Sequence, residues 1–182
     1  MDFDIILEEI ENWIFNYLDV ANDYYNGNKP CPFAKKAFLN NKVRIIPGTR
    51  KDVMSEVSNW DDTYELVAVV FEDYEGLEAW AEEVNKKLYK NNLYLMSMEP
   101  LEEGDTFGDP VLDAQDWGVL TDKVYGWVFI QRLSHVEKYS KVLEDQGYYK
   151  NLDKDFLSYV EQRRKYHESR QEEQENEKRR SS

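Results

Sequence analysis

Apolar residues in the first part of the chain recur every three or four positions. Between residues 3 and 18 the recurring positions are Phe3, Ile6, Leu7, Ile10, Ile14, Tyr17 and Leu18. Polar residues such as Glu8 and Glu11 occupy positions between them. This spacing places the apolar side chains on one face of a helix. The sequence therefore predicts an amphipathic helix over residues 3–18.

Four short apolar runs have the pattern of β-strands. Residues 66–71 read Leu-Val-Ala-Val-Val-Phe, an almost unbroken run that is typical of a strand buried on both faces. Further runs at 43–46, 93–98 and 125–133 predict three more strands.

Helical patterns lie between and after these strands. They are expected at 33–38, where Pro32 suits the first turn, at 50–58, at 77–88, from Ser134 and from Asp153. The start at Ser134 has the form of a capping box, in which Ser134 caps the helix and Glu137 reaches back to the backbone.

The order of these elements predicts an α+β fold. The strand, helix and strand of residues 66–98 form a right-handed parallel crossover, and we expect the strand at 125–133 to join the same sheet in the antiparallel direction. With the strand at 43–46 this gives a two-layer sandwich around a four-stranded mixed sheet, ferredoxin-like in style, with an N-terminal helix and a C-terminal helical tail.

The chain is expected to divide into an α+β domain over residues 1–150 and a charged tail over 151–182. After Glu161 the apolar face disappears, and residues 161–182 contain seven basic and six acidic residues. Such a segment cannot bury enough surface to fold by itself. The tail is therefore predicted to be helical or partly disordered.

The formal net charge is −14 at pH 7, which argues against direct binding of nucleic acid, because that requires a basic face. The charge suits either a basic protein partner or simple solubility. No apolar run is long enough to span a membrane, and the acidic start of the chain is unlike a signal peptide. Cys31 is the only cysteine, so no internal disulfide is possible, and we expect a soluble, cytoplasmic protein.

Few residues point to chemistry. Cys31 precedes a predicted helix, and a helix dipole lowers the pKa of a thiol at that position and makes it reactive. The alternative is that Cys31 is a small buried apolar residue. Residues 99–122 carry eight acidic residues and no Lys or Arg. Asp105 and Asp109 in this stretch are weak candidates for metal ligands. The simpler interpretation is a solvated loop. Neither His135 nor His167 lies in a recognisable catalytic or zinc motif, and no cofactor-binding fingerprint occurs.

Five segments form a series along the chain: Trp13 in the first helix, Cys31-Pro32-Phe33-Ala34, Val43-Arg44-Ile45, Ser97-Met98-Glu99-Pro100 and the strand that ends at Arg132. Together they resemble an uncharacterised bacterial family with a domain of unknown function, marked by a Leu-Cys-Pro-Phe-Ala motif. The resemblance implies a shared fold and a pocket. Two family histidines correspond to Glu99 and Phe129 here, so a site that depends on them is either lost or rebuilt with Glu99.

Two principal hypotheses for function follow. The first is a protein-binding or accessory domain that acts through an acidic, aromatic-rich surface, because Tyr and Trp are enriched at interfaces. The second is an enzyme or ligand-binding domain whose pocket holds Cys31 as nucleophile, Glu99 as acid or base and Arg132 as the ligand-binding group. The simpler alternatives are a strand-end salt bridge for Arg132 and a surface carboxylate for Glu99. A third hypothesis, an acidic mimic of nucleic acid, would depend on residues 99–122.

Overall fold

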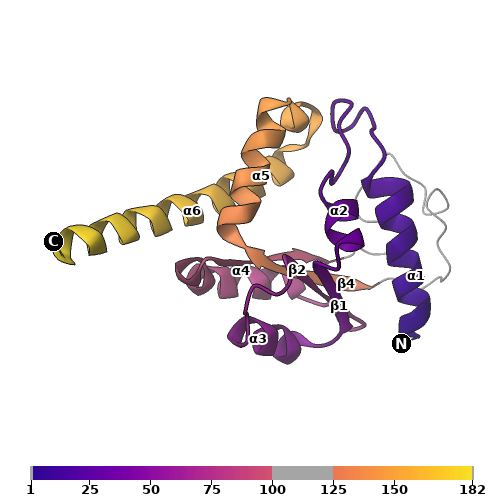
Figure 1. Cartoon of the computed structure of the whole chain (residues 1–182), viewed down its shortest axis with the longest axis horizontal. Coiled ribbons are helices and arrows are strands. Elements are labelled where there is room, and N and C mark those ends of the chain that lie inside the picture. The colour runs from indigo at the N-terminus through magenta and orange to yellow at the C-terminus, as the bar shows by residue number, and fades with distance from the viewer. Residues whose placement is uncertain (1, 100–124, 182) are drawn as a thin grey trace.

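Four strands form one mixed sheet in the computed structural model, which describes residues 2–99 and 125–181 (Figure 1). The strands are β1 (Val43–Pro47), β2 (Leu66–Phe71), β3 (Leu93–Met98) and β4 (Gly126–Arg132), in the order β1-β2-β4-β3. Strand β1 runs parallel to β2, and β4 runs antiparallel to both of its neighbours. The predicted α+β class and the four-stranded mixed sheet are confirmed.

The crossover from β2 to β3 is split by β4. Helix α4 (Leu77–Leu88) connects the two parallel strands, and β4 inserts between them, pairing Val67 with Ile130 on one side and Leu95 with Ile130 on the other. The central pair β2 and β4 is almost entirely buried. This explains why the apolar run of residues 66–71 lacks alternation.

Helices cover both faces of the sheet. On one face, Val69 and Val128 belong to an apolar core shared with α4 and with α3 (Arg50–Ser58). On the other, Val70 and Trp127 pack with α1 (Phe3–Trp13) and with the π-helical turn η1 (Ile14–Leu18). Figure 1 shows α3 and α4 on one side of the sheet and α1, α2 (Ala34–Leu39) and α5 on the other. The sheet therefore carries a helical layer on its second face, in addition to the two layers that the sequence predicts.

The free edge of β3 is completed by a side chain. Asn85 of α4 is 2% exposed. Its amide donates to the carbonyl of Leu95 and accepts from the backbone N–H of Leu95, both at 2.8 Å. A buried backbone group without a partner is costly, so Asn85 takes the place of a fifth strand at this point.

Helix α5 (Leu133–Asp145) begins differently from the prediction. Ser134 does not cap it. Instead, the side chain of Asn92 accepts from the backbone N–H of Ser134 at 3.0 Å. Glu137 does not reach back to the helix start, but faces the last helix and forms a buried ion pair with Arg163. The predicted capping box is therefore wrong, because a residue on the turn before β3 supplies the cap.

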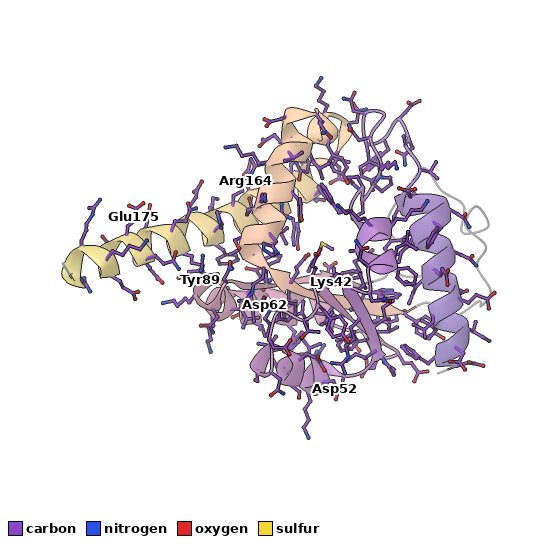
Figure 2. The ribbon with its side chains drawn as sticks, in the orientation of Figure 1. Lys42, Asp52, Asp62, Tyr89, Arg164 and Glu175 are labelled. Carbon is purple, nitrogen blue, oxygen red and sulfur yellow. The ribbon has the colours of Figure 1, made fainter. Side chains whose placement is uncertain are left out.

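The last helix, α6 (Lys154–Ser181), packs on the body over its first half. Val160 and Arg163 are buried, and the Tyr166 hydroxyl donates to Glu82 of α4 at 2.6 Å. Residues 171–180 are exposed, although Glu173 still accepts from the Tyr89 hydroxyl at 3.2 Å and pairs with Lys90 at 3.4 Å. Figures 1 and 2 show the end of this part, which carries Glu175, projecting from the body. The tail proper thus begins within α6 rather than at residue 151. Among the described residues, no helix has the length and apolar content needed to cross a bilayer.

Candidate functional site

Cys31 lies at the edge of the apolar core that α1 shares with the sheet. It is half-buried, packs against the cluster that contains Ile14 and Trp127, and forms no disulfide. Burial raises the pKa of the thiol and outweighs the opposing effect of the Phe33 and Ala34 backbone N–H groups. A thiol with a raised pKa stays protonated at neutral pH and is a poor nucleophile. The structure therefore favours the interpretation of Cys31 as a small apolar residue.

Glu99 caps a helix that is distant in sequence. One of its carboxylate oxygens accepts from the backbone N–H of Gly76 at 2.8 Å, and the other accepts from that of Glu78 at 3.1 Å. Both groups lie at the start of α4, where a negative charge also interacts favourably with the helix dipole. Glu99 thereby joins the end of β3 to the start of α4, and its carboxylate has a structural role as a helix cap.

Arg132 ends β4 in a dense set of contacts. Its Nε and Nη2 groups donate to the two carboxylate oxygens of Asp62, each at 2.6 Å, and Nη1 donates to the carbonyl of Asn91 at 3.1 Å. The guanidinium also lies over the ring of Trp60, 5.9 Å from its centroid. The Arg132 hydrogen bonds, followed by that of Trp60, lower the pKa of Asp62 to about 2. Arg132 is therefore a strand-end salt bridge with each nitrogen engaged.

A surface depression of about 340 Å³ adjoins this ion pair. It is lined by Asp62, Tyr64, Glu65, Asn92, Arg132 and His135. The lining has two carboxylates for one guanidinium, and Asp62 already fills the bidentate face of Arg132. An anionic ligand would have to displace Asp62 before it could use the geometry that suits carboxylate or phosphate.

The predicted pocket of Cys31, Glu99 and Arg132 does not form. The pairing of β3 with β4 places Leu93 opposite Arg132, whereas Glu99 follows the far end of β3. Six residues of extended strand span about 20 Å, so Glu99 and Arg132 lie at opposite ends of the sheet. The prediction grouped them because each stands at a position of the motifs that resemble the family, and those motifs do not converge at one place in the fold.

The predicted metal candidates Asp105 and Asp109 lie outside the described residues, as does most of the acidic stretch 99–122. Within residues 2–99 and 125–181, no group of three or more His, Cys, Asp or Glu side chains is placed to hold a metal ion.

The outer face of α1 carries a row of exposed carboxylates. Asp4, Glu8 and Glu11 recur at intervals of four and three residues, and all three are exposed. They lie opposite the buried positions Ile6 and Ile10, which hold the helix on the sheet. Residues 1–28 contain seven acidic residues and no Lys or Arg. We call Asp4, Glu8 and Glu11 the α1 carboxylate face.

This face was visible in the sequence, because the helical spacing that predicts the buried side of α1 also defines its outer side. The aromatic half of the predicted surface is less evident, because many rings contact one another. Trp13 lies 6.5 Å from Trp127, and Tyr25 lies 4.9 Å from Tyr148.

Comparisons of the chain with family models, with curated proteins and with solved structures found no match in any of the three. The resemblance carried by residues 31–34 stays a prediction. The charges and contacts of the described residues are therefore the basis for inferring a function.

Proposed function

We propose that this chain is a protein-binding domain that docks a basic segment of a partner protein on the α1 carboxylate face. The observation that carries the proposal is the row of Asp4, Glu8 and Glu11, exposed on a helix that has no basic residue. Within the described ranges these three side chains form no ion pair with Lys or Arg, so their charge is available to a partner.

The helix presents the three carboxylates in a fixed arrangement. With a rise of 1.5 Å per residue they are separated along the axis by about 6 Å and about 4.5 Å. The inner face of α1 is anchored by Ile6, Ile10 and the adjoining Ile14, each at most 5% exposed. Little order is lost when a partner binds a surface that is already rigid, and this favours binding.

The expected interaction is fast and sensitive to salt. Exposed ion pairs contribute about 0.2–1 kcal/mol each, so three pairs supply only about 1–3 kcal/mol. Their larger effect is on the rate and specificity of encounter, since complementary potentials steer a basic partner to the face. Ile5, which is 37% exposed beside this face, adds an apolar contact.

The same face opposes direct binding of nucleic acid, because its carboxylates repel phosphates. The unpaired Cys31 suits a reducing compartment, so we place the protein in the cytoplasm. These two expectations belong to the proposal.

The test is a capture experiment with tagged protein in lysate of the organism that encodes it, at low and high salt, read out by quantitative mass spectrometry. The test variant is the triple substitution Asp4→Asn, Glu8→Gln and Glu11→Gln. A specific basic partner should be recovered at low salt, lost with the variant, and released as the ionic strength rises past about 0.15 M, where the Debye length is about 8 Å.

A matched control removes the same charge from another exposed helix. Glu161→Gln, Glu168→Gln and Glu172→Gln lie on exposed positions of α6 and should leave the recovery of the partner unchanged. Equal recovery with the α1 variant, or no specific partner at low salt, would contradict the proposal.

A further inference from the structure

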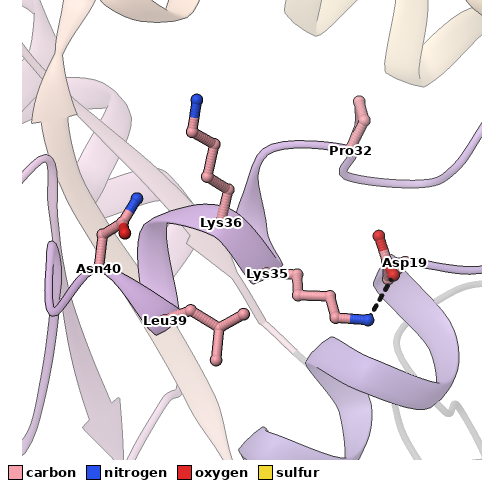
Figure 3. A pocket seen from close by; sticks show the side chains of 6 residues that line it. All are labelled: Asp19, Pro32, Lys35, Lys36, Leu39 and Asn40. Carbon is pink, nitrogen blue, oxygen red and sulfur yellow. Dashed lines mark hydrogen bonds and ion pairs between the residues drawn. The ribbon is translucent and has the colours of Figure 1, made fainter.

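A second surface depression, of about 350 Å³, lies where α2 meets the end of η1 (Figure 3). It is lined by Asp19, Pro32, Lys35, Lys36, Leu39 and Asn40. It lies apart from the Arg132 depression, with which it shares no lining residue.

The most exposed large apolar side chain of the described residues, Leu39, lines this depression. Leu39 is 62% exposed and lines it, and Val20 is 50% exposed and directly follows the lining residue Asp19. Both values exceed those of the other large apolar side chains in the described ranges. Exposed apolar side chains are ordinary on a surface, but one as exposed as Leu39 within a depression with a charged rim is typical of an interaction site.

The rim of the depression is basic in an acidic protein. Residues 29–51 contain seven Lys and Arg and no acidic residue. Asp19 accepts from Lys29 at 2.6 Å and from Lys35 at 2.9 Å, so one carboxylate is shared between two ammonium groups. Figure 3 shows Lys35 reaching Asp19, whereas Lys36 points away from it. Lys36 is exposed, and no carboxylate in the described ranges forms an ion pair with it.

We propose that this depression binds an acidic, amphipathic segment of a partner protein. An apolar side chain of that segment lies against Leu39 and Pro32, and a carboxylate one helical turn away pairs with Lys36. The charge of the depression is complementary to such a segment and unfavourable for a basic one, which gives selectivity as well as attraction. This proposal uses a different surface from the α1 carboxylate face and does not depend on it.

The test is fluorescence anisotropy with a labelled twelve-residue peptide in which Leu recurs at helical spacing and the remaining positions alternate Glu and Ala. Two further probes replace Glu by Lys, or Leu by Ser. The variants are Lys36→Glu and Leu39→Ser, each at an exposed position, and Lys141→Glu is the control with the same change of charge on α5. The same peptide is also titrated into isotope-labelled wild-type protein and followed by NMR.

The Glu/Leu probe should bind the wild-type protein and the Lys141 variant alike. We expect about tenfold weaker binding with Lys36→Glu and with Leu39→Ser, and amide shifts that centre on residues 19–20 and 32–40. Both control probes should bind weakly. The proposal is overturned if the Glu/Leu probe binds the Lys36 variant as well as wild type, if shifts centre elsewhere, or if sedimentation shows that a second copy of the chain occupies this surface.

Discussion

Replacing one member of the buried ion pair between Glu137 and Arg163 should destabilise the protein more than most single substitutions do. The pair joins α5 to α6, and the two side chains are 9% and 6% exposed. Burial lowers the pKa of Arg163, but the neighbouring Glu137 carboxylate more than offsets this, so the net direction is upward. Glu137→Leu would leave a buried guanidinium without its carboxylate.

The size of the effect follows from the burial. Removing one partner of a buried ion pair costs about 3–5 kcal/mol, whereas replacing both by apolar residues is often neutral or stabilising. Nη2 of Arg163 has no hydrogen-bond partner among the described residues, so the pair is not fully satisfied even in the native protein. We therefore expect Glu137→Leu to cost about 3–5 kcal/mol, and Glu137→Leu with Arg163→Met to recover most of that loss.

The assay is urea unfolding followed by tryptophan fluorescence and circular dichroism. With a urea dependence of about 2 kcal/mol per molar, the single substitution should lower the midpoint by about 1.5–2.5 M. The control is Glu144→Gln, which breaks an exposed ion pair between the same helices, since Glu144 accepts from Arg164 at 2.7 Å and 3.1 Å. It should cost less than about 1 kcal/mol.

A loss of less than about 1 kcal/mol in the free energy of unfolding with Glu137→Leu would contradict this prediction, because an exposed ion pair contributes that little. That result would mean that Arg163 is solvated and that α6 does not pack on α5. A double variant as unstable as the single one would refute the second half, because the loss would then come from packing and not from an uncompensated charge.

Three further predictions test other contacts. Asn85→Ala should cost about 2–4 kcal/mol in urea unfolding, because it leaves the buried N–H and carbonyl of Leu95 without partners; a loss below about 0.5 kcal/mol would show that water replaces the amide. In the wild-type protein the pair of Asp62 with Arg132 stabilises the fold above about pH 4, and this stability is lost as the pH falls toward the Asp62 pKa of about 2. Asp62→Asn should remove this pH-dependent stability. Because the pair is partly exposed, acid titrations of the two proteins should differ by at most about 1 kcal/mol in the free energy of unfolding. Cys31 should react with a thiol reagent at about pH 8 at least about tenfold more slowly in the native than in the denatured protein, because burial raises its pKa; equal rates would show an accessible thiolate.

The elements of the fold followed from short-range patterns. The apolar run of residues 66–71 and the helical spacing of residues 3–18 each report local burial, and each became the predicted element. The start of α3 is also set by residues close in sequence, because the Thr49 hydroxyl donates to the Asp52 carboxylate three residues later at 2.7 Å. Patterns of this kind fail only where the partner is remote in sequence.

Remote partners explain the errors. The start of α4 is capped by Glu99, which lies 21 and 23 residues along the chain from the two N–H groups that donate to it. Likewise Asn92, rather than Ser134, caps α5 across 42 residues. Both substitutes lie at the ends of β3, whose position in the sheet is set by β4. No local rule could have identified them before the strand order was known.

The helical tail shows the same limit in another form. Charged residues after Glu161 predict a solvated segment, but Arg163 is 5% exposed. The charge of Arg163 can be buried because it pairs with Glu137 of α5, which lies 26 positions earlier in the chain. The buried pair and the contact of Tyr166 with Glu82 fix the helix on the body over its first turns. The exposed residues 171–180 therefore extend from an anchored helix, and their direction is set by contacts that the charge pattern of the tail does not reveal.

Within the described ranges, the acidic and basic segments near the start of the chain are largely left unpaired with each other by the fold. Seven acidic residues lie within residues 1–28 and seven basic residues within residues 29–51, so nearby pairing could have neutralised both blocks. In the structure, Asp19 of the acidic block pairs with the basic one, through Lys29 and Lys35. The helix α1 turns its remaining exposed carboxylates away from the sheet, and Lys36 points away from Asp19. Two surfaces of opposite charge therefore stay open on neighbouring elements, and each is better explained by a partner than by the stability of the fold.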